Sequence, residues 1–118
     1  MRSMDTNCSF CQIITGATPS LTIYRDDLVT AFYDIHPLAP YHILIIPNKH
    51  IESVNAVKPV DEPILGLLFT VAHQIARQEG IDQSGYRMII NTGHNAGQAI
   101  YHLHLHMLGG RRMRFPMG

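Results

Sequence analysis

The stretch HLHLHM at residues 102–107 alternates a histidine with an apolar residue at every step. In a β-strand, side chains two residues apart point to the same face and lie about 6.6 Å from one another. A strand here therefore places three imidazoles on one face and three apolar side chains on the other, toward a core. In a helix, residues two apart do not face each other. The stretch predicts a half-buried strand with a functional face.

Further strands are predicted on both sides of this stretch. Short β-prone runs occur at residues 21–25, 29–34, 42–46 and 86–91, and each is bounded by Asp, Pro or Gly. The first two runs predict a hairpin, because only a short acidic turn separates them. Together with a histidine strand over residues 101–108, they predict a five-stranded, mostly antiparallel sheet.

Two helices are predicted to cover the sheet. Residues 10–14 form a short helix that ends near Gly16. Residues 61–79 form a long one, with Asp61 as its N-cap, an apolar stripe at helical spacing and Gly80 at its end. Strands with one long and one short helix packed against them define an α+β fold.

Length and charge limit what the chain can be. A chain of 118 residues forms one small domain, over residues 1–118. Nine Lys and Arg balance nine Asp and Glu, so no general field favours nucleic acid or an acidic membrane, and an anionic ligand must be bound locally. The one basic cluster, RRMR at residues 111–114, is interpreted as a solvated terminus. The polar N-terminal sequence and the lack of a long apolar segment predict a cytoplasmic protein.

Three interpretations of the histidine strand are open from the residues alone. The histidines could be surface or core-edge residues without a function, or they could bind a metal ion. They could also catalyse phosphoryl transfer. An imidazole has a pKa near 6.5, so at neutral pH a large fraction is the free base, which can attack phosphorus without a separate activating base. A second, protonated imidazole could then donate a proton to the phosphate or the leaving group.

A glycine-rich loop, GHNAGQ at residues 93–98, precedes the histidine strand. Glycines allow backbone N–H groups to approach phosphate oxygens closely, so the loop supports the interpretation as a phosphoryl-transfer site. The pair Cys8 and Cys11 has the spacing of zinc ligands. By itself it is ambiguous between a metal site, a redox pair and two buried thiols.

Taken together, these motifs resemble the histidine triad (HIT) nucleotide-binding proteins. The resemblance rests on GQAIYHLHLHMLGGR at residues 97–111, and on FYDI at 32–35, PYH at 40–42 and PNKH at 47–50. It covers almost the whole chain and is strongest for the branch that cleaves purine nucleoside phosphoramidates. It implies a homodimer in which two such sheets join into one of ten strands, and hydrolysis at the α-phosphate of AMP or GMP conjugates without a catalytic metal.

The resemblance also implies a role for each residue that matches a family motif. His104 is the implied nucleophile, which forms a nucleotidyl-histidine intermediate, and His106 contacts the phosphate or the leaving group. His42 lies close to both. The implied nucleotide-binding residues are these three sets: Phe10, Ile13, Phe32, Ile35 and Leu44 around the base, Asp34 at the ribose, and Asn91, Gly97, Gln98, Ala99, His104 and His106 near the phosphate.

Some members of the family bind a structural zinc ion through a cysteine pair and two histidines. The matching positions here are Cys8, Cys11, His50 and His102. Zinc at these residues would tie the N-terminal segment to the histidine strand, next to the implied nucleophile.

One position departs from the family pattern. A serine usually follows the glutamine in the phosphoramidate-cleaving branch, and this chain has Ala99 there. The missing hydroxyl is expected to affect the rate and the leaving-group preference more than the reaction class. Two alternatives therefore stay open: a dinucleoside polyphosphate hydrolase, and a purine-nucleotide sensor or scaffold with incidental activity. The tail at residues 115–118 is expected to reach the cavity of a partner subunit.

Overall fold

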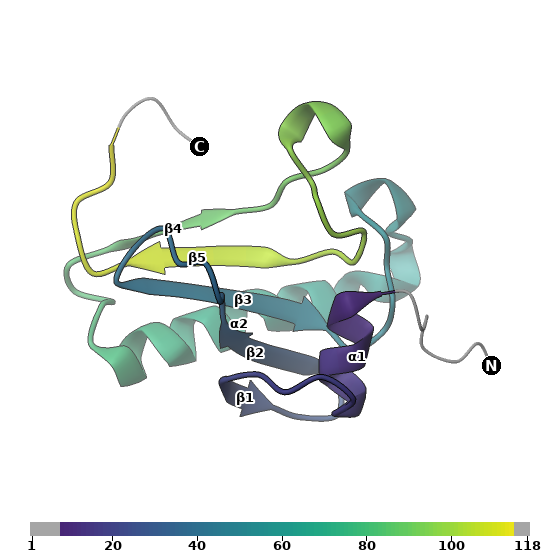
Figure 1. Ribbon diagram of the computed structural model, residues 1–118, viewed down its shortest axis with the longest axis horizontal. Helices are drawn as coiled ribbons and strands as arrows, with labels where there is room; N and C mark the ends of the chain where they lie inside the picture. The colour runs from purple at the N-terminus through teal and green to yellow at the C-terminus, as the bar shows by residue number, and fades with distance from the viewer. Residues whose placement is uncertain (1–7, 115–118) are drawn as a thin grey trace.

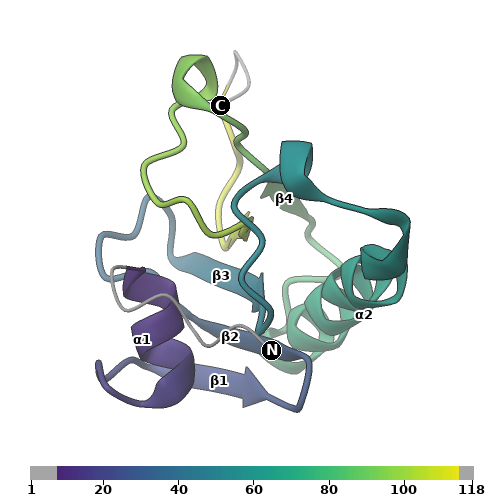
Figure 2. The ribbon, with the colours of Figure 1, turned by 90° about the vertical axis from the view of Figure 1, so that its right-hand side faces the viewer.

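The computed structural model describes residues 8–114, and in them a five-stranded antiparallel sheet separates two helices (Figure 1). The strands lie in the order β1-β2-β3-β5-β4. Turned by 90°, the molecule shows α1 on one face of the sheet and α2 on the other (Figure 2). Residues 115–118, for which the sequence predicts a contact with a partner subunit, lie outside the described residues. The α+β fold predicted from the sequence is confirmed.

All five predicted strands are present. They are β1 (Thr22–Arg25), β2 (Val29–Tyr33), β3 (Tyr41–Pro47), β4 (Tyr86–Ile89) and β5 (Leu105–Gly109). The first two form the predicted hairpin, and β5 pairs with β3 on one side and β4 on the other.

The histidine strand is shorter than predicted. Regular strand structure begins at Leu105, so His102 and His104 lie in the segment that leads into β5. The alternation still continues through this segment, because Leu103, Leu105 and Met107 are all buried in the core beneath α2. β4 also ends earlier than predicted, at Ile89.

Helix α2 (Glu62–Glu79) covers one face of the sheet. Its buried stripe includes Leu68 and Ile75, which belong to the same apolar core as Ile43 and Ile45 of β3. Gly80 ends the helix with φ 74°, a conformation that glycine adopts without strain.

Asp61 precedes α2, as predicted for an N-cap, but its side chain does not cap the helix. The carboxylate instead accepts hydrogen bonds from Nζ of Lys49, at 2.6 Å, and from the backbone N–H of Lys58. It thereby connects the segment after β3 to the start of the helix.

Helix α1 (Ser9–Thr15) covers part of the opposite face. Phe10 and Cys11 of this helix form a second, smaller core with Phe32, Leu44 and Ile46 of the sheet. The helix leaves the β5 and β4 side of this face uncovered (Figure 1). No helix in residues 8–114 is both long and apolar enough to cross a membrane.

Candidate active site

The second core continues into two groups of polar side chains. One group contains Cys8, Cys11, His50 and His102, at the end of β3 and the start of the histidine segment. The other contains Asp34, His42 and His106. His104 connects the two groups, because it lies between His102 and His106 in the sequence. Its ring is 4.8 Å from the ring of His106, and it forms a hydrogen bond to the backbone of His102.

The donor atoms of the first group lie close enough together to share a metal ion. Nδ1 of His50 and Nδ1 of His102 are 3.2 Å apart, and Sγ of Cys11 lies 3.2 Å and 3.5 Å from them. Sγ of Cys8 lies 3.4 Å from Nδ1 of His102. Tetrahedral zinc with ordinary bond lengths would separate two nitrogens by about 3.3 Å and a nitrogen from a sulfur by about 3.6 Å. These four residues can therefore hold a metal ion such as zinc.

The second ring nitrogen of His102 also has the partner that a metal-binding histidine usually has. Its Nε2 lies 2.8 Å from the carbonyl oxygen of Pro47, which fixes the proton on Nε2 and leaves Nδ1 as the ligand atom. Burial lowers the pKa of His102 to about 4, so the ring is neutral, as a metal ligand must be.

The orientation of His104 is set by the backbone. Its Nδ1 lies 2.7 Å from the carbonyl oxygen of His102, and a carbonyl can only accept, so the Nδ1 of His104 carries a proton and donates it. In the neutral ring, Nε2 is then unprotonated and carries the lone pair that a nucleophile needs. Phe10 holds the ring from the side, with the two ring centres 5.0 Å apart and the planes at 88°.

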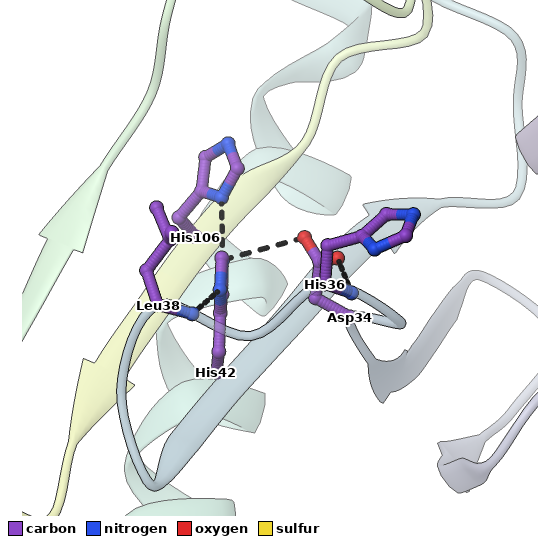
Figure 3. A network of polar contacts seen from close by, with 5 residues as sticks. All are labelled: Asp34, His36, Leu38, His42 and His106. Atoms are coloured by element: carbon purple, nitrogen blue, oxygen red, sulfur yellow. Dashed lines mark hydrogen bonds and ion pairs between the residues drawn. The ribbon is translucent and has the colours of Figure 1, made fainter.

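His42 and His106 form a chain of hydrogen bonds that begins at the backbone (Figure 3). The N–H of Leu38 donates to Nδ1 of His42 at 3.1 Å. Nε2 of His42 must then carry the proton of the neutral ring, and it donates to Nδ1 of His106 at 3.0 Å. His106 in turn carries its proton on Nε2, as a donor available to a ligand.

Asp34 approaches the same chain from the side. One oxygen lies 3.5 Å from Nε2 of His42, and the other accepts from the backbone N–H of His36 at 2.8 Å (Figure 3). The donor atoms of Asp34, His42 and His106 lie within metal-binding distance of one another. The hydrogen bond between the two rings is sufficient to explain how close they are.

Burial keeps the three site histidines neutral. It lowers the pKa of His42 and of His104 below 6.5, although the charge of Asp34 opposes the shift in both. Burial lowers the pKa of His106 to about 4, with further lowering from His104 and His42. At neutral pH the ring of His106 is therefore neutral, whereas the sequence alone allows a protonated imidazole at this position.

A cavity of about 410 Å³ opens between α1, β2 and the loop before the histidine segment. We call it the α1 cavity. Its volume lies in the range of about 300–1,000 Å³ that is usual for small-molecule sites. Ten of the residues expected to bind a nucleotide line it: Phe10, Ile13, Phe32, Asp34, Ile35, Leu44, Gly97, Ala99, His104 and His106.

A second cavity, of about 260 Å³, lies on the uncovered side of the same face. We call it the β4 cavity. It is lined by Leu38, His42, Arg87, Ile89, Asn91, His106, Leu108, Arg111, Met113 and Arg114. His106 is the one residue that lines both cavities, so the two meet at its ring.

Two of the expected nucleotide-binding residues lie elsewhere. Asn91 lines the β4 cavity, and its amide donates to the carbonyl oxygen of Ala96. Gln98 is buried outside both cavities, where its side chain accepts from Gly93 and donates to the backbone oxygens of Glu52 and Ile100. Gln98 thus supports the glycine-rich loop from within.

Several residues of the site were not identified from the sequence. Leu38 contributes a backbone N–H, and the identity of its side chain gives no sign of this role. The prolines at positions 37 and 40 do indicate a loop of fixed conformation there. Arg87 and Arg111 come from segments far apart in the sequence, and no motif connects them. The α1 cavity has seven further lining residues: Ser9, Thr18, Pro19, Ser20, Tyr33, His36 and Ile100.

The sequence is similar to those of known proteins. The family model described as "HIT domain" matches residues 15–113. The purine nucleoside phosphoramidase of Escherichia coli K12 is 56% identical over 109 residues, which cover 92% of this chain and 88% of that protein.

Solved structures are similar to this one over almost its whole length. A HIT family hydrolase from Legionella pneumophila superposes with a TM-score of 0.93 at 44% identity, over 95% of this chain and 100% of that one. A histidine triad nucleotide-binding protein from Candida albicans superposes with a TM-score of 0.81 at 27% identity, over 95% of this chain and 85% of that one.

Proposed function

This chain belongs to the HIT domain family, and on that premise we propose that it hydrolyses purine nucleoside 5′-phosphoramidates, of the AMP-amine or GMP-amine type. It is an enzyme of the hydrolase class, like its relatives from E. coli and L. pneumophila. The observation that carries the proposal is the position of His104. Its Nδ1 proton is bound to a backbone carbonyl, and its ring lines the α1 cavity.

In the proposed reaction, Nε2 of His104 attacks the α-phosphorus of a nucleotide held in the α1 cavity. The N–P bond to His104 forms and the P–N bond to the amine breaks. The departing nitrogen takes up a proton from solvent, and an equal proton is released when water attacks phosphorus in the second step. The Nε2–H of His106 donates to the phosphate or to the departing nitrogen. Water then attacks phosphorus, which releases the nucleoside monophosphate and restores the neutral ring of His104.

The remaining cavity residues fit the parts of a nucleotide. Phe10, Phe32 and Leu44 give the α1 cavity an apolar wall for the purine. The Asp34 carboxylate can accept hydrogen bonds from the ribose hydroxyls, and Gly97 allows a phosphate oxygen to approach the backbone closely.

Incubation with an AMP-amine conjugate tests the function directly. AMP should be released, and acid-labile phosphorus should be found on His104 when the reaction is quenched early. Tight AMP binding without turnover of any conjugate would contradict the proposal and favour a nucleotide sensor. Faster turnover of dinucleoside polyphosphates would favour the second kind of hydrolase.

We also propose that Cys8, Cys11, His50 and His102 bind one structural zinc ion. The support is the match between their donor-atom separations and tetrahedral geometry, together with the bond from His102 to Pro47. Metal analysis of protein purified without a chelator should give about one zinc per chain, and removal of the zinc should lower the melting temperature. Well under one zinc per chain would contradict the proposal.

A homodimer is the proposed assembly. β4 is an edge strand, and apolar side chains are exposed on it, just after it and on α2: Met88 of β4 is 41% exposed, Ile90 after the strand 37% and Phe69 of α2 51%. Exposed edge strands with apolar side chains are suited to pairing with a second chain, here into a ten-stranded sheet. Sedimentation analysis should show a dimer, and Met88→Asp should shift it toward monomer. A cytoplasmic location stays a prediction.

A further inference from the structure

The β4 cavity has a charge that the proposed chemistry at His104 does not explain. Three arginines line it, Arg87, Arg111 and Arg114, and no acidic residue is among its described lining residues. The chain as a whole has no net charge, so this local excess of positive charge is a feature of the cavity and not of the whole surface.

The arginines are held in place by backbone groups. Both terminal nitrogens of Arg87 lie 3.3 Å from the carbonyl oxygen of Arg114. Arg111 donates to the carbonyl oxygens of Arg112, at 2.9 Å, and of Leu38, at 2.8 Å. A guanidinium group has five N–H donors, so each retains donors for a ligand after these contacts.

The turn after β5 brings Arg111 to this position. Gly110 has φ 93°, and a side chain at this position would lie 2.8 Å from Cβ of Pro40. Glycine therefore allows the end of β5 to approach the loop of Leu38 closely, and the next residue reaches over the β4 cavity. The basic cluster at residues 111–114 is thus partly built into the fold, rather than being only a solvated terminus.

The position of the cavity relative to His104 indicates what it binds. In-line displacement at phosphorus places the departing group on the side opposite the attacking atom. His104 lines only the α1 cavity, whereas His106 lines both, so a phosphate beside both rings has the β4 cavity on its far side. Among the lining residues, Leu108 is buried and Ile89 half-buried, and we call these two the apolar floor, whereas Arg111 and Arg114 are exposed.

We propose, on the basis of the function proposed above, that the β4 cavity binds the amine displaced from phosphorus and selects amines that carry an anionic group. The apolar floor contacts the body of the amine, and Arg87 and Arg111 bind the anion. The preferred substrates are then nucleoside phosphoramidates of amines that bear a carboxylate or a phosphate.

The test uses AMP conjugates of three amines. β-Alanine and β-alaninamide have nearly the same shape and differ in charge, and phosphoethanolamine carries a phosphate in place of the carboxylate. A hydrogen-bonded charge at a partly exposed site is expected to raise kcat/KM for the β-alanine conjugate about ten-fold over the amide. The phosphoethanolamine conjugate shows which anion is preferred.

Arg87→Gln and Arg111→Gln should each reduce this ratio to about three-fold or less, with the loss confined to the anionic conjugates. Arg112→Gln is the matched control, because Arg112 is exposed and does not line the β4 cavity. The ratio should also fall as salt is added.

A binding measurement separates this proposal from the proposed function. The His104→Ala protein should bind the β-alanine conjugate more tightly than the amide, by a similar ratio, whether or not the wild type turns them over. Equal affinities and equal kcat/KM for both conjugates would overturn the proposal, as would a preference that persists in the Arg87→Gln/Arg111→Gln double variant. A binding preference without any turnover would overturn the hydrolase function alone.

Discussion

β5 and the segment before it have two faces that differ in polarity and in surroundings, although the residues of the two faces alternate along one short stretch. On one face, Leu103, Leu105 and Met107 are 2% exposed or less and pack beneath α2. On the other face, His104 and His106 border cavities and bond to polar groups. One face contributes to folding and the other carries the proposed chemistry, and the alternation of a strand points the two sets of side chains in opposite directions.

This separation has an energetic reason. The apolar face loses contact with water completely, which stabilises the fold by about 25 cal/mol per Å² of apolar surface buried. The histidine face is largely buried too, but Nδ1 of His104 and of His106 has a hydrogen-bond partner, so burial lowers the pKa of the rings rather than leaving these atoms unsatisfied. Substitutions on the two faces should therefore produce different kinds of defect.

The largest expected effect is the loss of activity in His104→Ala. Removal of the nucleophile should lower kcat by on the order of a thousand-fold or more, while the free energy of unfolding changes little. Turnover of an AMP-amine conjugate and urea denaturation measure the two quantities. His73→Ala, an exposed histidine on α2, is the control and should retain full activity. A fully active His104→Ala protein would refute covalent catalysis by this ring.

Leu105→Ala should show the opposite pattern. The cavity left in the core should lower the free energy of unfolding by about 2–5 kcal/mol, whereas kcat per folded molecule should change only a few-fold. Leu21→Ala is the matched control, because Leu21 is 74% exposed, and it should cost little stability. If Leu105→Ala abolished activity without loss of stability, the two faces would not be separate.

Ala99→Ser should increase the activity of the histidine face. Ala99 lines the α1 cavity, where a serine hydroxyl could donate to the phosphate. Such a hydrogen bond to a charged group would raise kcat about ten-fold if it forms mainly in the transition state. Ala96→Ser, in the 3₁₀ turn His94–Ala96, is exposed, lies outside this cavity and should have no effect. An unchanged rate in Ala99→Ser would show that the hydroxyl is not needed in this chain.

The smallest expected effect is on the pH profile. An ordinary imidazole with a pKa near 6.5 would lose about ten-fold in its neutral fraction at pH 5.5. Burial lowers the pKa of His104 below this value and that of His106 to about 4. We therefore expect kcat/KM to fall by clearly less than ten-fold between pH 7.5 and pH 5.5. A ten-fold fall would mean that the site is more hydrated than the described contacts indicate.

The same shifts affect stability. A histidine whose pKa is lower in the folded state binds its proton more readily in the unfolded chain, so acid favours unfolding. For His106, the free energy of unfolding should fall as the pH decreases from about 6.5 toward about 4. Urea denaturation at a series of pH values measures this, and His106→Gln should flatten the dependence.

Much of the fold could be predicted because it depends on local patterns. Alternation assigns Leu105 and His106 to opposite faces, and the glycines at positions 16 and 80 end the helices as predicted. The boundaries of β5 could not be predicted, because the alternation of apolar and polar residues continues upstream of the regular strand pairing.

The site was less predictable where it depends on backbone groups or on distant segments. The bond from the N–H of Leu38 to His42 involves an atom that every residue except proline has. The side chain of Gln98 turns inward because the carbonyl oxygens of Glu52 and Ile100 need donors there, and no spacing in the sequence encodes this. The meeting of Arg87 with the segment after β5 arises only once the sheet has formed.

The carbonyl oxygen that orients His104 has a further consequence. It holds the ring without adding a second negative charge to that of Asp34, whereas a carboxylate in its place would make the imidazole more basic. A less basic imidazole is a better leaving group, and in the proposed second step it must depart when water attacks phosphorus. The backbone of His102 thus aligns the ring for bond formation while leaving the phosphorylated ring reactive enough for the cycle to close.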